Sequence, residues 1–193
     1  DPHSETFKKA LAGGVTTVNV MPGSGHLMSG QTAYLKLRNA DKIEEMLFVD
    51  DPQNEIAGGL KMANGTNSIG NPPFPGTRAK SASMVRELFI KAQDYKEKVE
   101  EANGDPEKMP TRAVGMDALV EVLNGERIVH YHTHRHYDIL TAIRLAEEFG
   151  FRVVLHHVSE AWKIADEIAE ADVPASIIVL DAPGGKPEAT DIR

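Results

Sequence analysis

The chain has 193 residues, 41% of them hydrophobic and 26% charged, which is typical of a folded globular protein and excludes a disordered or fibrous one. Its 21 basic and 29 acidic residues give a net charge of −8, which disfavours nucleic acid, and no stretch reaches the roughly 20 apolar residues that cross a bilayer. Because the sequence has no cysteine and no signal-peptide pattern, we expect a cytoplasmic protein without disulfides, thiolate zinc sites, nucleic-acid partners or membrane partners.

The first part of the chain predicts one short helix followed by short strands. The helix covers residues 4–12 and ends at a Gly-Gly pair, which supplies the left-handed conformation common after a helix. Residues 15–20 are rich in β-branched side chains, so we expect a buried strand there. Further short strands are predicted at 33–37 and 59–63, and three prolines predict an irregular loop at 69–76.

The second part predicts a regular alternation of strands and helices. A long helix is expected at 78–102, with Met84, Leu88, Ala92 and Tyr95 on its buried face, and a second helix at 111–123. The last third reads β-α-β-α-β, which produces parallel strands with flanking helices and hence an α/β fold, either a barrel or a doubly wound sheet. We expect a single domain over residues 1–193. The segments are strands at 127–132, 151–156 and 175–180, and helices at 137–149 and 160–171.

A group of histidines lies where two of these strands end. Six of the eight histidines fall between His130 and His157. Strand alternation places His130, His132 and His134 on one face, and adjacent strands about 4.8 Å apart would let His132 and His157 reach one metal ion at their carboxyl ends. The alternative is that these are neutral, hydrogen-bonded structural histidines. Two ligands do not complete a zinc site, and the candidates for a further ligand are Lys61, Asp181 and His134.

Two glycine-rich loops, at 22–26 and 183–186, also follow predicted strands. Backbone N–H groups in such loops can hold an anion, but neither loop has the spacing of a phosphate-binding motif. We interpret both as turns and assign no cofactor-binding residue to them. The sequence contains neither Gly-x-Ser-x-Gly nor His-Glu-x-x-His, so the standard serine hydrolase and zincin interpretations have no support.

A series of short motifs runs through nearly the whole chain. Residues 10–18, Ala-Leu-Ala-Gly-Gly-Val-Thr-Thr-Val, precede Pro-Gly-Ser-Gly at 22–25, Gly-Gln-Thr at 30–32, Gly-Leu-Lys-Met-Ala at 59–63 and Thr-Arg at 77–78. The most specific pattern covers 129–173, where a strand bearing His132, the run Asp-Ile-Leu-Thr-Ala at 138–142, the segment 147–152 and a strand ending in His157 succeed one another. Together these motifs resemble the metal-dependent amidohydrolase superfamily, within its imidazolonepropionase-related branch.

The resemblance implies a TIM-like (β/α) barrel that carries zinc or another divalent metal at the carboxyl ends of its strands. In that family the metal lowers the pKa of a bound water, and the hydroxide attacks an amide or ring C–N bond. The matching motifs give His132 the position of the fifth-strand metal histidine and His157 that of the sixth-strand histidine, which binds metal or contacts substrate. They also imply that His134 is a pocket residue with a catalytic role and that Lys61 is a further metal position.

The chain also departs from the family pattern. The His-x-His pair of the first strand has no counterpart, and the eighth-strand aspartate would lie beyond Arg193. Thr66 replaces a carboxylate, and His156 stands where a glutamate is usual. We therefore expect the central part of an amidohydrolase barrel, a partial TIM-like barrel without its first and last strands. We expect its parent to act on a C–N bond of a cyclic amide or small amide, and the isolated chain to hydrolyse poorly or not at all.

Two further expectations concern partners. If the histidines are structural, the alternative function is a noncatalytic α/β domain for small-ligand binding or assembly. A barrel that lacks its end strands leaves two open edges, at residues 15–20 and 175–180, with unpaired backbone groups. We therefore expect a homo-oligomer, specifically a dimer, besides the small-molecule substrate.

Overall fold

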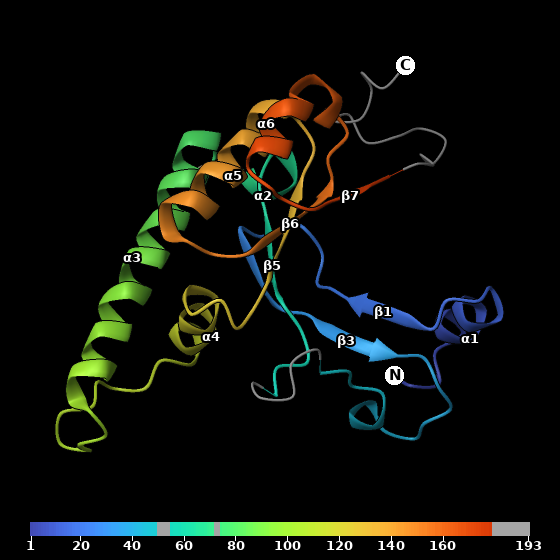
Figure 1. Ribbon diagram of the computed structural model, residues 1–193, viewed down its shortest axis with the longest axis horizontal. Coiled ribbons are helices and arrows are strands. Elements are labelled where there is room, and N and C mark those ends of the chain that lie inside the picture. Colours follow the sequence, from blue (N-terminus) through green and yellow to red (C-terminus); the bar gives the residue numbers. More distant parts are fainter. Residues whose placement is uncertain (50–54, 72–73, 179–193) are drawn as a thin grey trace.

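The computed structural model describes residues 1–49, 55–71 and 74–178, and within them the strands form two separate sheets (Figure 1). The larger sheet has five strands in the order β2-β4-β5-β6-β7; β2 is antiparallel to β4, and the other neighbours are parallel. The smaller sheet is the antiparallel pair β1-β3. The strands are β1 (Thr17–Val20), β2 (Met28–Gln31), β3 (Ala33–Lys36), β4 (Leu60–Ala63), β5 (Val129–Thr133), β6 (Val153–His157) and β7 (Ala175–Ile177).

Helices connect the parallel strands, and Figure 1 shows α3 and α5 together on one side of the large sheet. α3 begins after Thr77, whose side chain accepts a hydrogen bond from the backbone N–H of Lys80, and ends at Asn103 in the left-handed conformation. None of the helices in the described ranges has the length and apolarity needed to span a bilayer. The helices are α1 (Glu5–Ala12), α2 (Thr66–Ile69), α3 (Arg78–Ala102), α4 (Val114–Leu123), α5 (His136–Phe149) and α6 (Ala165–Glu170), with 3₁₀ turns η1 (Ile43–Glu45) and η2 (Ala161–Ile164).

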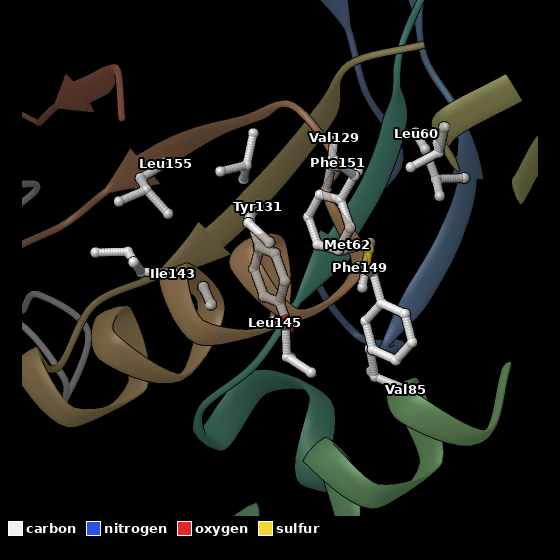
Figure 2. Close-up of a cluster of buried hydrophobic side chains, with 14 of the residues drawn as sticks. Leu60, Met62, Val85, Val129, Tyr131, Ile143, Leu145, Phe149, Phe151 and Leu155 are labelled. Atoms are coloured by element: carbon white, nitrogen blue, oxygen red, sulfur yellow. The ribbon is translucent and has the colours of Figure 1, made fainter. Parts of the chain in front are cut away.

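The main hydrophobic core lies between the large sheet and these helices (Figure 2). Phe89 of α3 stacks on Phe149 and Phe151, with ring centroids 5.0 and 4.9 Å away. The strands contribute every second residue to this core, because side chains alternate between the two faces of a sheet. The intervening residues of β4 and β5 therefore point to the opposite face, where the histidines lie. The strand residues in the core include Leu60, Met62, Val129, Tyr131, Val153 and Leu155.

The predicted β-α-β-α-β order is confirmed, since β5, β6 and β7 are parallel neighbours joined through α5 and through η2 with α6. The protein is thus an α/β fold with a parallel sheet and flanking helices. The described strands form an open sheet and do not close into a barrel. The last predicted strand forms at Ala175–Ile177, and residues 179–180, Asp181 and the loop 183–186 lie outside the described residues.

The strand predicted at 15–20 forms at Thr17–Val20, but its predicted burial and its place at an edge of the large sheet were wrong. β1 pairs instead with β3, with Thr17 opposite Lys36, and Val20 is 43% exposed. The sheet edge opposite β7 is β2. The sequence did not indicate β2, because Met-Ser-Gly-Gln contains no β-branched residue and its glycine, Gly30, adopts a positive φ of 110° at a register shift.

α3 covers the predicted residues, but its buried face differs from the predicted one. The fully buried apolar side chains are Val85, Phe89, Ala92 and Ala102, so Ala92 alone of the predicted face is confirmed, whereas Met84 and Leu88 pack only partly against the core. The stack of Phe89 on two other phenylalanines explains the difference, because the largest ring on the helix occupies the centre of the interface. Helical periodicity alone does not distinguish this face from one rotated by a single residue.

Candidate active site

Strands β5 and β6 deliver the histidines to one end of the sheet. On β5, Tyr131 points into the helix-covered core, so His130 and His132 on either side of it point to the opposite face. The register pairs His132 with His156 and Thr133 with His157. Both strands therefore end at the same edge with imidazoles on them, as the sequence predicted.

His157 joins this face through an unusual backbone conformation. Side chains alternate along a strand, so His157 should share the core face with Leu155. Its backbone instead has a φ of 77°, a conformation that residues other than glycine rarely adopt. Its ring contacts the ring of His132, with centroids 4.6 Å apart. A strained residue at the end of a parallel strand is the kind of feature that functional sites retain.

His134 completes a cluster of three imidazoles. Its ring centroid lies 4.7 Å from that of His132 and 5.2 Å from that of His157, on which it stacks with an interplanar angle of 11°. We call His132, His134 and His157 the histidine cluster. His132 and His134 are buried while His157 is half-buried, so His157 is the member that an incoming small molecule could meet first.

Two polar side chains that the sequence did not identify orient the cluster. The amide nitrogen of Asn67 donates to Nε2 of His132 across 2.8 Å, and Nδ1 of His134 lies 2.7 Å from the hydroxyl of Ser159. Asn67 follows Thr66, where this chain departs from the family pattern, so the sequence indicated this segment but not the contact of Asn67 with His132. Nothing in the sequence distinguished Ser159 from other serines.

Tyr34, His130 and His156 form a row of hydrogen-bonded side chains on the same face, and His130 lies two residues before His132 on β5. We call this row the second histidine chain. Nε2 of His130 is 2.7 Å from the hydroxyl of Tyr34 on β3, and Nδ1 of His130 is 2.9 Å from Nε2 of His156. Burial, followed by the nearby His156 and the charge of Lys61, lowers the pKa of His130 to about 4. Burial and Lys61 also lower the pKa of His156. A neutral His130 has one ring proton, so it donates through one nitrogen and accepts through the other.

Gly59 makes room for this second chain. A Cβ atom at Gly59 would lie 2.4 Å from Cδ2 of His130 and 2.5 Å from the carbonyl oxygen of Ile128. A glycine is therefore required where β4 begins, because any side chain would displace the His130 ring or the backbone of the neighbouring strand.

Lys61 lies on the histidine face but level with His130 rather than with His132. The register of β4 and β5 pairs Lys61 with His130 and Ala63 with His132. The Lys61 side chain is 4% exposed and its ammonium group donates to the hydroxyl of Ser24, 3.2 Å away. The structure thus brings His132, His134 and His157 into mutual contact, and it places Lys61 two residues before the position of β4 that is level with His132, beside His130.

Glu160 fixes the two loops that carry the cluster. Its backbone N–H donates to the carbonyl oxygen of His134 at 3.0 Å, and its buried carboxylate accepts from Arg135 and Lys163 and from both the backbone and ring N–H groups of His136. Burial by itself would raise the pKa of Glu160, but these hydrogen bonds outweigh it and hold the pKa well below the ordinary range. The carboxylate therefore stays charged and links the loop after β5 to the loop after β6.

The donor set of this face does not by itself fit a metal ion. Imidazole is a preferred zinc ligand, but a zinc site uses at least three protein ligands. Among the described residues no group of three or more His, Asp or Glu side chains is arranged to hold a metal. The candidate ligand Asp181 is outside those residues. The chemistry that the arrangement itself provides is proton transfer and hydrogen bonding by imidazoles.

Comparison with solved structures relates the chain to the amidohydrolases. It is similar to a crystal structure described as an amidohydrolase from Thermotoga maritima MSB8, with 36% sequence identity and a TM-score of 0.88. The match covers 98% of this chain and 49% of the other, so the chain spans about half the length of that protein. No protein-family model and no curated protein matched the chain. The similarity in sequence and fold supports a relationship of this chain to the amidohydrolases in general.

Proposed function

We propose that the chain is the central part of a metal-dependent amidohydrolase of the imidazolonepropionase-related branch, built on a TIM-like barrel, which hydrolyses a C–N bond of a cyclic amide or small amide. The observation that carries the proposal is the contact between His132 of β5 and His157 of β6 at the carboxyl ends of parallel strands. Ligands of α/β enzymes bind at such ends. The 36% identity to an amidohydrolase supports the coarser part of this assignment, an amidohydrolase.

In this proposal the histidine cluster contacts the substrate and contributes to a metal site. His157, which is half-buried, faces the substrate and moves a proton at its ring. His134, whose Nδ1 lies against Ser159, holds the substrate or His157 in position. His132 and His157 contribute to a site for zinc or another divalent ion, which Lys61 or residues outside the described ranges would complete. That Lys61 is a further metal ligand stays a prediction. That residues 1–193 form a single domain also stays a prediction.

Metal binding gives the direct test. We would load the chain with zinc, dialyse it and measure bound zinc by mass spectrometry for the unaltered chain and for the double variant His132→Ala/His157→Ala. The matched control is His3→Ala/His26→Ala, which removes two exposed histidines from elsewhere in the chain. We expect stoichiometric zinc in the unaltered chain and the control, and its loss in the cluster variant. Equal zinc content in both double variants would refute the assignment of the ligands.

Activity is tested separately on a panel of cyclic amides. We expect little or no turnover by the chain itself, because charge stabilisation by two histidines alone is a small part of what such a site needs. Chelator-sensitive turnover that disappears in His132→Ala would show that the chain is more complete than proposed. Absence of zinc together with unchanged folding of the cluster variant would favour the alternative, a noncatalytic α/β domain for small-ligand binding or assembly.

A homodimer is also proposed, and its basis is the β7 edge of the sheet. The residues of β7 are exposed, with Ile177 67% accessible, and among the strands of residues 1–49, 55–71 and 74–178 it has a neighbour on one side only. Such an edge favours pairing with another chain. Sedimentation at micromolar concentration tests it: a monodisperse monomer would contradict the dimer.

A further inference from the structure

A cavity of about 490 Å³ lies on the side of β5 opposite the histidine cluster, between the first turns of α3 and α5. Tyr131, the core residue between His130 and His132, forms part of its wall, together with Ser81 and Ala82 of α3 and Thr141 of α5. Its volume falls within the range of small-molecule sites, roughly 300–1,000 Å³. The residues on this side take no part in the proposed hydrolysis.

The charged groups around this cavity are mostly basic. Three arginines, Arg78 and Arg86 from α3 and Arg144 from α5, line it, whereas Asp138 is the single carboxylate among the lining residues. The chain as a whole has a net charge of −8, so a concentration of three guanidinium groups on two facing helices is a local exception. A concave surface with positive charge raises the local concentration of anions.

The guanidinium groups are held in place yet keep donors available. Arg78 contacts both carboxylate oxygens of Asp138 through Nε, at 2.9 and 3.1 Å, and lies over the ring of Tyr137 at 5.1 Å. Arg86 contacts Glu148 in the same way, through Nε. Within the described part of the chain, the terminal Nη groups of these two arginines make no hydrogen bond.

Arg144 contributes a charge that no carboxylate balances within the described ranges. Its one hydrogen bond there runs from Nη2 to the hydroxyl of Thr141 at 3.1 Å. Ion pairs through Nε thus fix two guanidinium groups while their outer amino groups stay available, and a third arginine lines the same cavity from the neighbouring helix. This is the arrangement that recognises the two or three oxygens of an oxyanion.

We propose that this cavity binds the carboxylate or phosphate group of a small ligand. The oxyanion accepts hydrogen bonds from the Nη groups of Arg78, Arg86 and Arg144, and the rest of the ligand lies against Tyr137 and the alanines of α3. The site is independent of the histidine cluster, because it faces the other side of the sheet. Its failure would therefore leave the proposed hydrolase function untouched.

The test titrates the 193-residue chain with inorganic phosphate and, separately, with succinate, at constant ionic strength maintained with sodium chloride. Isothermal calorimetry gives affinity and stoichiometry, and NMR amide shifts locate the ligand. We expect saturable one-to-one binding of at least one probe, with shifts at Ser81 and Thr141. Tighter phosphate binding would identify a phosphorylated ligand, and tighter succinate binding a carboxylate.

The variant Arg86→Gln/Arg144→Gln removes two charges without leaving the buried Asp138 unpaired. We expect its affinity to fall at least tenfold. The matched control, Lys91→Gln/Lys96→Gln, removes the same charge from α3 at positions paired with glutamates of the same helix and outside the cavity. Its affinity should stay within twofold of the unaltered chain. Equal affinities of the two variants, shifts elsewhere in the protein, or the absence of saturable binding would each overturn the proposal.

Discussion

Replacement of Glu160 by glutamine tests whether one buried carboxylate holds the two loops of the candidate active site together. The Glu160 side chain is 2% exposed, makes ion pairs with Arg135 and Lys163, and accepts a hydrogen bond from the ring of His136. Glutamine has nearly the same volume, so Glu160→Gln removes the charge without creating a cavity. Arg135 and Lys163 would then lose the carboxylate that neutralises them.

The expected cost follows from the burial of the group and of its partners. Loss of one partner from a buried ion pair costs about 3–5 kcal/mol. The side chains of Arg135 and Lys163 are 24% and 31% exposed, and water partly compensates them. We therefore expect Glu160→Gln to lower the free energy of unfolding by about 2–3 kcal/mol at pH 7.

The effect should depend on pH in a definite direction. The folded protein lowers the pKa of Glu160 below its ordinary value of 4.5. A carboxyl with a lowered pKa stabilises the fold at pH values above 4.5 and loses that contribution as the pH falls further. The stabilities of Glu160→Gln and the unaltered chain should therefore converge in acid.

Urea denaturation at pH 7, 5 and 4 measures both quantities. Glu148→Gln is the matched control, since Glu148 also pairs with an arginine, but with side chains 39% and 40% exposed, and should cost less than about 1 kcal/mol. A loss for Glu160→Gln no larger than that of Glu148→Gln, or a difference that does not shrink in acid, would refute the reasoning.

Three other predictions concern the core and the second histidine chain. Phe89→Ala removes a ring stacked between two others and should cost about 3–5 kcal/mol in urea denaturation; less than about 1 kcal/mol would mean that the stack is not formed. Gly59→Ala places a methyl group 2.5 Å from a backbone oxygen and should cost about 1–3 kcal/mol, with shifted His130 resonances; an unchanged spectrum would contradict this close packing. His130 should remain neutral in NMR titrations down to about pH 4, so its contribution to stability declines as the pH falls from 6.5 towards that value. Protonation near pH 6.5 would show that the ring is solvated.

Much of the candidate site could be predicted from the sequence because regular strands translate position into direction. His132 and His157 end successive strands of a β-α-β unit, and parallel strands place such residues at the same edge whatever the rest of the fold does. The contact between their rings follows from this connectivity together with the backbone turn at His157, which periodicity did not indicate.

The residues that surround the histidines could not be predicted, because they come from distant parts of the chain. Tyr34 reaches His130 across 96 positions of sequence, and Asn67 reaches His132 across 65. No local sequence pattern around Tyr34 or Asn67 indicates which histidine each of them contacts. Only the packing of β3 and of the loop after β4 against β5 decides these contacts.

The sequence by itself determined the α/β class, the parallel order of the last three strands and the strand ends at which the histidines gather, because these follow from local periodicity and short connections. The tertiary structure alone decided that β1 pairs with β3 outside the main sheet, that Phe89 rather than Leu88 centres the helix interface, and that Lys61 lies level with His130. Each of these depends on which of several similar apolar surfaces comes into contact, and that choice is made by the fit of side chains far apart in the chain.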